Sequence, residues 1–295
     1  MKKLSFLLVL LSTQVFAESR SERIIYGVDN RVEPHQASEL QQKLSLSTAG
    51  MINRIKVVEH GDHAFLPPAT IVNDMGLCPD EKFSEQPSSV VCSGFLVAPD
   101  LLVTAGHCIP NQARCDEVSW VFDYKIKKDD NRADMMVPKS KIYKCAEVIE
   151  AKLEASPTGL VDYALVKLDR VVDDREPLKY RTEGKIADGQ EIFVIGHPSG
   201  LPTKVAGDAK VTSNSEANYF EANLDTFGGN SGSAVFNATT GIVEGILVRG
   251  AKDYVGDEVL GCARVFEAPQ EIEGISSLGE SVSRITDIKA LAENP

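Results

Sequence analysis

From about Ser47 onward, the apolar residues of this 295-residue chain occur in short runs separated by Gly, Pro, Asn and Asp. Runs of this length with turn-forming residues between them are typical of β-strands. Several runs are continuous rather than alternating, as expected of strands that are buried on both faces or that form a barrel wall. Long helical periodicity is absent until Val282, Ile285, Ile288 and Leu291. The pattern therefore predicts a mostly β protein with strands at 90–97, 101–105, 118–122, 164–168, 191–195, 233–236 and 242–248.

The composition is that of an ordinary folded protein, with 43% hydrophobic and 25% charged residues. It argues against a disordered, collagen-like or coiled-coil chain, and the length suits one large domain or two modest ones. Residues 18–45 are polar and charged, with helical spacing only around Ala37 to Leu46, as in a pro-segment or an N-terminal arm. A net charge of −12 repels phosphate backbones and anionic lipid. Neither nucleic acid nor a membrane is therefore an expected partner.

The first 17 residues have the pattern of an export signal. Lys2 and Lys3 precede an apolar run from Leu4 to Leu11, and a small residue, Ala17, follows at the predicted cleavage point. The alternative is a buried N-terminal helix. No later stretch is long and apolar enough to cross a bilayer. We therefore predict a secreted or periplasmic protein without a membrane span.

The cysteine count supports an oxidising compartment. Six cysteines follow the predicted signal, and an even number in an exported chain indicates three disulfides, although six cysteines allow 15 pairings. No Cys-x-x-Cys pair occurs, so neither a zinc site nor a thioredoxin-like redox site is expected. We predict no metal and no cofactor.

Three short segments carry the residues for nucleophilic catalysis, in the order His, Asp, Ser. They are LVTAGHC at 102–108, with His107, VDYALVKL at 161–168, with Asp162, and GGNSGSA at 228–234, with Ser231. Each segment alone could be purely structural, since a lone His after a strand or a glycine-rich loop is common. Together they supply a hydroxyl nucleophile, an imidazole base to take its proton and a carboxylate to orient the imidazole. Glycines beside the serine let backbone N–H groups approach a developing oxyanion.

These motifs resemble those of the trypsin/chymotrypsin-like serine proteases, and the bacterial branch with the glutamyl endopeptidases is the most similar. The resemblance covers roughly residues 47–250. It implies His107 as general base, Asp162 as its orienting partner and Ser231 as nucleophile, with the N–H groups of Gly229 and Ser231 as the oxyanion hole. The implied products are those of peptide-bond hydrolysis through an acyl-enzyme intermediate.

The resemblance also implies an all-β fold of two six-stranded antiparallel β-barrels with a short C-terminal helix. Residues 46–170 would form the first barrel, with His107 and Asp162, and residues 171–295 the second barrel, with Ser231, and the closing helix. Cys92 and Cys108 match the histidine-loop disulfide of the family. The remaining predicted pairs are Cys115 with Cys145 and Cys78 with Cys262.

The sequence leaves the substrate preference open. Asp225 lies six residues before Ser231, where trypsin-like enzymes have the acid that binds Lys or Arg. Asp225-Thr226 also resembles glutamyl endopeptidases, in which the Thr contacts a substrate carboxylate, although their pocket histidine would fall near Leu247. Arg249 could receive an acidic side chain, neutralise Asp225 or point to solvent. The predicted pocket residues are Asp225, Thr226, Leu247, Val248, Arg249 and Gly250.

Maturation and catalysis each have an alternative. Arg23-Ile24 resembles a zymogen activation site, but Asn230 stands where the family has the Asp that pairs with the new α-amino group, and an uncleaved leader is equally consistent. We predict a secreted serine endopeptidase that acts as a monomer on proteins or peptides and prefers a charged residue before the scissile bond. The alternative is a catalytically silent binding protein or toxin- or adhesin-like effector on the same fold.

Overall fold

The computed structural model describes residues 25–67, 69–70, 76–128, 135–156, 159–250, 253–268 and 279–292. The predicted export signal at 1–17 and the predicted cleavage site between Arg23 and Ile24 lie outside the described residues.

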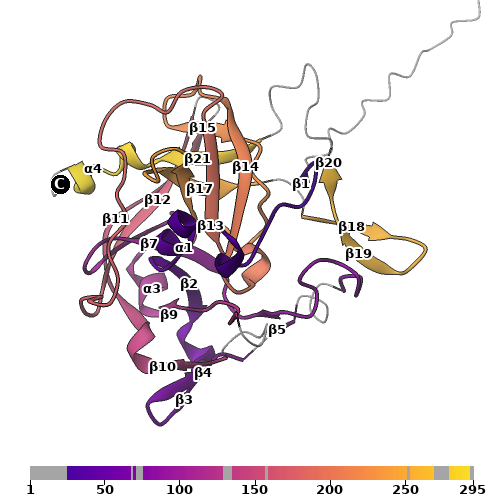
Figure 1. Cartoon of the computed structure of the whole chain (residues 1–295). Helices are drawn as coiled ribbons and strands as arrows, with labels where there is room; N and C mark the ends of the chain where they lie inside the picture. Colours follow the sequence, from indigo (N-terminus) through magenta and orange to yellow (C-terminus); the bar gives the residue numbers. More distant parts are fainter. Residues whose placement is uncertain are drawn as a thin grey trace, which may run out of the picture.

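Two closed six-stranded antiparallel barrels form the body of the molecule (Figure 1), which confirms the predicted fold class. The first has the order β11-β12-β8-β7-β2-β9. Its strands are β2 (Thr48–Asn53), β7 (Cys92–Ala98), β8 (Leu101–Thr104), β9 (Val118–Phe122), β11 (Ile142–Ser156) and β12 (Gly159–Leu168). The second has the order β13-β14-β15-β21-β17-β16. Its strands are β13 (Glu191–Gly196), β14 (Lys204–Ser213), β15 (Tyr219–Ala222), β16 (Ala234–Asn237), β17 (Val243–Arg249) and β21 (Glu280–Arg284).

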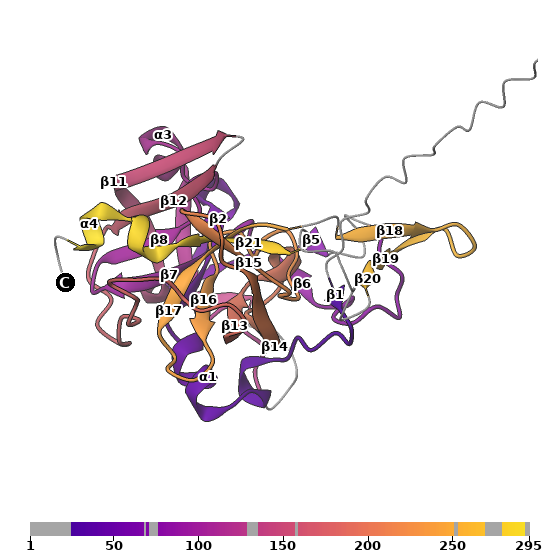
Figure 2. The same ribbon diagram turned by 90° about the horizontal axis from the view of Figure 1, so that it is seen from above.

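The smaller elements lie around the barrels. The short strands are β1 (Ile25–Tyr26), β3 (Val58–His60), β4 (His63–Phe65), β5 (Ala69–Thr70), β6 (Pro87–Ser88), β10 (Met136–Pro138), β18 (Tyr254–Asp257), β19 (Cys262–Val265) and β20 (Glu267–Ala268). The helices are α1 (Glu39–Ser45), α3 (Gln112–Asp116) and α4 (Lys289–Ala292), with 3₁₀ turns at Pro34–Gln36, Arg54–Lys56, Lys139–Lys141, Pro198–Gly200 and Ile285–Asp287. Figures 1 and 2 both place the β18–β19 hairpin away from the barrels, on the side of β1 and β20.

The C-terminal segment corrects one sequence expectation. Val282 lies in β21 and Ile285 in a 3₁₀ turn, so the helix begins only at Lys289. The apolar spacing arises because Val282 faces the interior of the second barrel, whereas Ile288 and Leu291 are buried in a core shared by both barrels. Because a buried strand is followed closely by a short buried helix, the apolar residues have a spacing similar to that of one face of a single helix.

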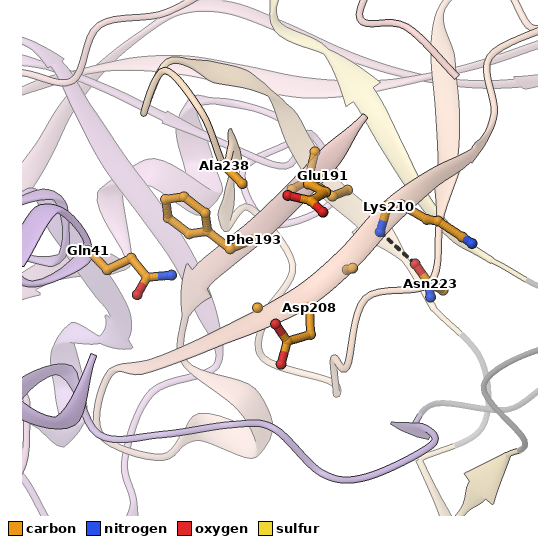
Figure 3. A pocket seen from close by; sticks show the side chains of 10 residues that line it. Gln41, Glu191, Phe193, Asp208, Lys210, Asn223 and Ala238 are labelled. Atoms are coloured by element: carbon orange, nitrogen blue, oxygen red, sulfur yellow. Dashed lines mark hydrogen bonds between the residues drawn. The ribbon is translucent and has the colours of Figure 1, made fainter. Parts of the chain in front are cut away.

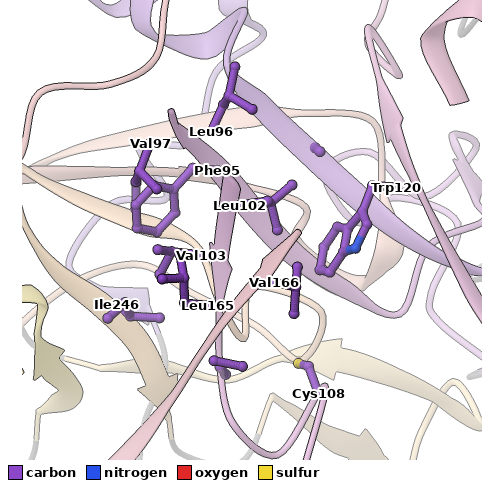
Figure 4. Packing of buried hydrophobic residues seen from close by; sticks show 14 of the residues in the cluster. Phe95, Leu96, Val97, Leu102, Val103, Cys108, Trp120, Leu165, Val166 and Ile246 are labelled. Carbon is purple, nitrogen blue, oxygen red and sulfur yellow. The ribbon is translucent and has the colours of Figure 1, made fainter. Parts of the chain in front are cut away.

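One continuous apolar core connects the barrels. Its first-barrel part contains Phe95, Trp120 and Leu165, and its second-barrel part contains Phe236 and Ile246. Figure 4 shows Ile246 beside side chains of the first barrel. Close packing of this kind resists relative movement of the barrels, so residues at the ends of strands from both barrels can form one site.

The N-terminal arm lies along the second barrel. Helix α1 begins at a capping box in which the Ser38 hydroxyl accepts the Gln41 N–H and the Gln41 side chain accepts the Ser38 N–H. Before the helix, Val32 pairs with Val205 of β14, and the buried Lys204 and Glu33 form an ion pair of 3.1 Å. Residues 25–45 are therefore part of the folded body.

Candidate active site

The first-barrel part of the site is a hydrogen-bonded His–Asp pair. In the pairing of β12 with β8, Ala164 lies opposite Thr104, which brings Asp162 near His107, three residues beyond the end of β8. The Asp162 carboxylate accepts a hydrogen bond at 2.8 Å from the side-chain Nδ1 of His107 and one at 3.0 Å from the His107 backbone N–H. The Asp162 side chain is 3% exposed and that of His107 36%. The carboxylate thus fixes the ring, while the ring remains accessible to a substrate.

The glycine before the histidine is required by close packing. A Cβ at Gly106 would lie 2.0 Å from the carbonyl oxygen of Lys152 and 2.9 Å from that of Tyr163. Both carbonyls belong to β11 and β12, the strands that present Asp162. Any larger residue at this position would push the histidine loop away from the carboxylate.

The second-barrel part of the site is the loop from Asp225 to Ser233, between β15 and β16, which contains Ser231. Ser93 of β7 binds this loop from the other barrel. Its N–H donates to the Ser231 carbonyl at 2.8 Å, and its hydroxyl donates to the Gly229 carbonyl at 2.8 Å. The same hydroxyl accepts the His197 N–H at 2.9 Å. This role of Ser93 could not be found from the sequence, because the residue lies in an ordinary strand pattern.

Close packing also brings the serine loop to the histidine loop. A Cβ at Gly232 would lie 2.1 Å from the Ser93 carbonyl oxygen and 3.0 Å from the backbone N of Ala105, two residues before His107. The loop that contains Ser231 therefore lies against the segment that precedes His107. The described residues include no hydrogen bond between the Ser231 hydroxyl and the His107 ring, and such bonds often form fully only when substrate is bound.

Two backbone N–H groups next to the serine are available to a ligand. Within the described residues, the N–H groups of Gly229 and Ser231 donate no hydrogen bond. The Gly228 carbonyl accepts from Ser199, so the N–H of Gly229 on the other side of that planar peptide points away from Ser199. Gly229 has φ +93°, and a Cβ there would lie 2.6 Å from the His197 carbonyl oxygen. Glycine is therefore needed for this loop conformation.

A small cavity of about 110 Å³ adjoins Ser231. It is lined by Thr226, Phe227, Gly228, Ser231, Leu247, Val248, Arg249, Gly250, Asp253 and Glu280. Five of the six predicted pocket residues belong to this lining, and the exception is Asp225. Glu280 and Asp253 were not found from the sequence, because neither lies in a recognisable motif.

Asp225 faces the N-terminal arm. Its carboxylate accepts the N–H groups of Tyr26 at 2.9 Å and Asn30 at 3.3 Å. Burial raises the pKa of Asp225 to about 6, against the lowering effect of these two N–H donors. The side chain that the sequence placed in the substrate pocket is thus part of the contact between the arm and the second barrel.

Asn230 has a local partner. Its side-chain oxygen accepts the Ser233 hydroxyl at 3.2 Å, and its residue is buried. The neutral amide cannot form the ion pair that an aspartate would make with a new α-amino group.

The three disulfides have the predicted pairs, Cys92–Cys108, Cys115–Cys145 and Cys78–Cys262. The first joins β7 to the residue after His107. The sulfurs of Cys92 and Cys108 lie within 4.8 Å of a His107 ring nitrogen, but because they are bonded to each other they do not form a thiolate metal site. The third disulfide connects the β18–β19 hairpin to the segment at Cys78.

A second cavity, of about 400 Å³, lies on β13 and β14 of the second barrel and contains none of the predicted site residues. Figure 3 shows its polar lining, including Glu191, Asp208 and Lys210, with the Lys210 N–H bonded to Asn223. Of these two cavities, only the smaller one is lined by Ser231.

Comparison with protein-family models identifies the family of this chain. Residues 92–246, more than half of the chain, match the family model of the trypsin-like peptidase domain. The chain therefore belongs to the trypsin-like peptidase family, and this membership supports a protease function. A search among curated proteins finds no match. Within the described residues, no helix has the length and apolar character needed to cross a membrane.

Solved structures show the same fold at low sequence identity. The VesB protease of Vibrio cholerae has a TM-score of 0.51 and 14% identity, covering 91% of this chain and 66% of that one. Human heparin binding protein has a TM-score of 0.51 and 13% identity, covering 91% and 98%. An inactivated protease paralogue of the scabies mite has a TM-score of 0.50 and 13% identity, covering 87% and 96%. Identities this low show the fold alone, so the glutamyl-endopeptidase branch stays a prediction.

Proposed function

We propose that this chain is an exported serine endopeptidase that hydrolyses proteins or peptides through Ser231, His107 and Asp162. The observation that carries the proposal is the Asp162–His107 hydrogen bond beside the Ser231 loop. The loop also contains the two N–H groups, of Gly229 and Ser231, that donate no hydrogen bond within the described part of the chain. These are the groups that acyl transfer requires.

In the proposed reaction, the Ser231 Oγ attacks the carbonyl carbon of the scissile bond as Nε2 of His107 takes its proton. Asp162 accepts the Nδ1–H and stabilises the imidazolium that forms. The tetrahedral oxyanion accepts the N–H groups of Gly229 and Ser231. Its collapse breaks the C–N bond, and His107 gives the proton to the leaving amine. Water, deprotonated by His107, then hydrolyses the acyl-enzyme by the same route.

The proposal includes recognition of a charged residue before the scissile bond in the Ser231 cavity. It also includes secretion or a periplasmic location, which the three disulfides favour because such bonds persist in oxidising compartments. The proposed protein acts as a monomer and needs no cofactor. Cleavage between Arg23 and Ile24 is a proposed maturation step, to be tested by N-terminal sequencing of active protein.

The central test is Ser231→Ala. This change should reduce turnover of peptide and ester substrates by about 10³-fold or more, with Ser215→Ala, an exposed serine outside the site, as the matched control. A fluorophosphonate probe should label the wild-type protein at Ser231, located by peptide mapping. Unchanged turnover in Ser231→Ala would exclude the mechanism. Absence of both labelling and turnover in the wild type would favour the alternative, a binding protein on the protease fold.

A further inference from the structure

Gly228, one position before the proposed oxyanion donor Gly229, is held on both sides. Its carbonyl oxygen accepts the N–H of Ser199 at 2.5 Å, and its N–H donates to Oδ2 of Asp253 at 2.8 Å. Because a peptide is planar, the hydrogen bond to the Gly228 carbonyl fixes the direction of the Gly229 N–H. A hydrogen bond at one end of a peptide also strengthens the donor at its other end. The two partners of Gly228 therefore determine how this donor is presented.

Ser199 has a backbone conformation that its neighbours must hold. Its φ is +52°, in the left-handed region that residues other than glycine seldom adopt. Its carbonyl accepts the hydroxyl of Ser88 of β6 at 2.6 Å, and its own hydroxyl is hydrogen-bonded to that of Tyr254. Ser199 is also buried. These contacts stabilise an unfavourable conformation and keep the Ser199 N–H directed at Gly228.

The two side chains that hold Gly228 and Ser199 belong to the base of the β18–β19 hairpin. Asp253 directly precedes β18, and Tyr254 is the first residue of that strand. The chain reaches this hairpin from β17, and β17 and β21 are paired with each other in the second barrel. The ring of Tyr254 also packs against that of Phe227 in the serine loop, with 5.5 Å between the ring centres. The base of the hairpin therefore contacts the serine loop directly.

The second strand of the hairpin is joined to a separate segment of the chain. Cys262 of β19 forms a disulfide with Cys78. The N–H of Ala263 donates to the carbonyl of Gly76 at 2.8 Å, and its carbonyl accepts the N–H of Cys78 at 2.9 Å. Because the hairpin is joined to other segments through both of its strands, it can act as a rigid support for the loop that it contacts.

We propose that the base of the β18–β19 hairpin positions the oxyanion donor of Gly229. Asp253 and Tyr254 are the positioning residues, and Tyr254 acts through Ser199. The hairpin thus influences the rate of acylation, although most of it lies away from the barrels (Figure 1). The proposal rests on the proposed proteolytic function and adds residues outside the triad on which the reaction depends. Because the donor is used only when the oxyanion forms, its position should affect kcat more than KM.

The first experiment uses two reagents that need no particular substrate side chain, p-nitrophenyl acetate and a fluorophosphonate probe. Asp253→Ala leaves the Gly228 N–H without its acceptor. It should lower kcat for the ester and the second-order rate constant for labelling at Ser231 by about tenfold each. Asp253→Asn keeps a carbonyl oxygen as acceptor and should recover most of the loss. Glu258→Ala, at an exposed residue in the turn of the same hairpin, is the matched control.

The second experiment tests whether Tyr254 acts through Ser199. Tyr254→Phe and Ser199→Ala each remove one hydroxyl from the same hydrogen bond. Each should lower the labelling rate constant by about threefold to tenfold, and the double variant should be no slower than the slower single variant, because the second change removes nothing further. Tyr143→Phe, in β11 of the first barrel, is the matched control. Fully multiplicative effects would contradict the path through Ser199.

The outcomes distinguish the inference from the proposed function. A wild-type protein that neither hydrolyses the ester nor is labelled at Ser231 would contradict the proposed function, and the inference would fail with it. An active wild type with unchanged rate constants in Asp253→Ala and Tyr254→Phe would overturn the inference alone. Urea unfolding of each variant is measured in parallel. A lower free energy of unfolding with unchanged rate constants would assign the hairpin a purely structural role and would also overturn the inference.

Discussion

The histidine side and the serine side of the site are held by different kinds of contact. On the histidine side, paired strands β8 and β12 of one barrel present both partners, and the Cys92–Cys108 disulfide closes the loop. On the serine side, Ser231 lies in a loop without regular secondary structure. That loop is fixed by hydrogen bonds from Ser93 of the other barrel and by glycines at close approaches.

Because of this difference, substitutions on the two sides of the site should have different effects. Asp162 and His107 form a contact within one barrel, so changing the charge of Asp162 alters the chemistry of the ring without altering what holds the barrels together. The serine loop depends on groups from the first barrel, from the N-terminal arm and from its own backbone. Substitutions in the serine loop should change the position of the loop, and they should change catalysis as a consequence. The following predictions test this distinction, from the largest expected effect to the smallest.

Asp162→Asn should have the largest effect. The amide can keep the position of the carboxylate, but it favours the wrong imidazole tautomer and leaves the imidazolium without an opposing charge. We expect kcat to fall by about 10⁴-fold, the loss typical of this change in triad proteases, with little change in the free energy of unfolding. The measurements are steady-state kinetics and urea unfolding. Asp116→Asn, at an exposed residue of α3, is the control, and a loss below tenfold in Asp162→Asn would contradict the assigned role.

Asp225→Asn should alter how stability depends on pH. Burial raises the pKa of Asp225 to about 6, so between about pH 4 and 6 the folded chain binds a proton that the unfolded chain releases. Wild-type stability from this group is therefore present at low pH and is lost as the pH rises through 6. A shift of about two pKa units corresponds to about 3 kcal/mol in the free energy of unfolding.

The experiment compares urea unfolding of Ser231→Ala with that of Ser231→Ala/Asp225→Asn from pH 4 to 7, because the inactive background prevents self-digestion. Other groups cancel in the difference. They include His197, whose pKa burial lowers to about 4. The wild-type Asp225 background should lose about 3 kcal/mol relative to the Asn variant over this range. A difference that does not change with pH would show that Asp225 is not buried in the way described.

The fold and the His–Asp pair could be predicted because their signals are local. The run at 101–105 is short and apolar and has turn-forming residues on both sides, and His107, two residues after it, belongs to a motif made of neighbouring residues. The strand pairing that joins Asp162 to His107 follows once the two-barrel fold is recognised. The Cys92–Cys108 pair follows from the same recognition, whereas the other two pairs were predicted without a family motif to support them, among the 15 pairings that six cysteines allow.

The acidic residues of the cavity beside Ser231 could not be predicted, because they reach it through tertiary contacts. Asp225 has the sequence position of a pocket acid, but its carboxylate turns to the backbone of Tyr26 and Asn30, almost 200 positions earlier in the chain. Glu280 reaches the cavity because β21 pairs with β17. The spacing of apolar residues favoured a helix across this segment, so the sequence pattern concealed the strand that carries the acid.

Ser93→Ala should have the smallest effect of these changes and tests the serine side directly. The change removes the donor to the Gly229 carbonyl and the acceptor of the His197 N–H, and leaves both groups without their partner. Because Gly229 supplies one of the proposed oxyanion donors, we expect kcat to fall about tenfold. KM should stay close to the wild-type value, since Ser93 does not line the cavity beside Ser231. Ser93→Thr, which keeps the hydroxyl, should recover most of the loss, and a change in unfolding free energy with unchanged kcat would reduce Ser93 to a purely structural role.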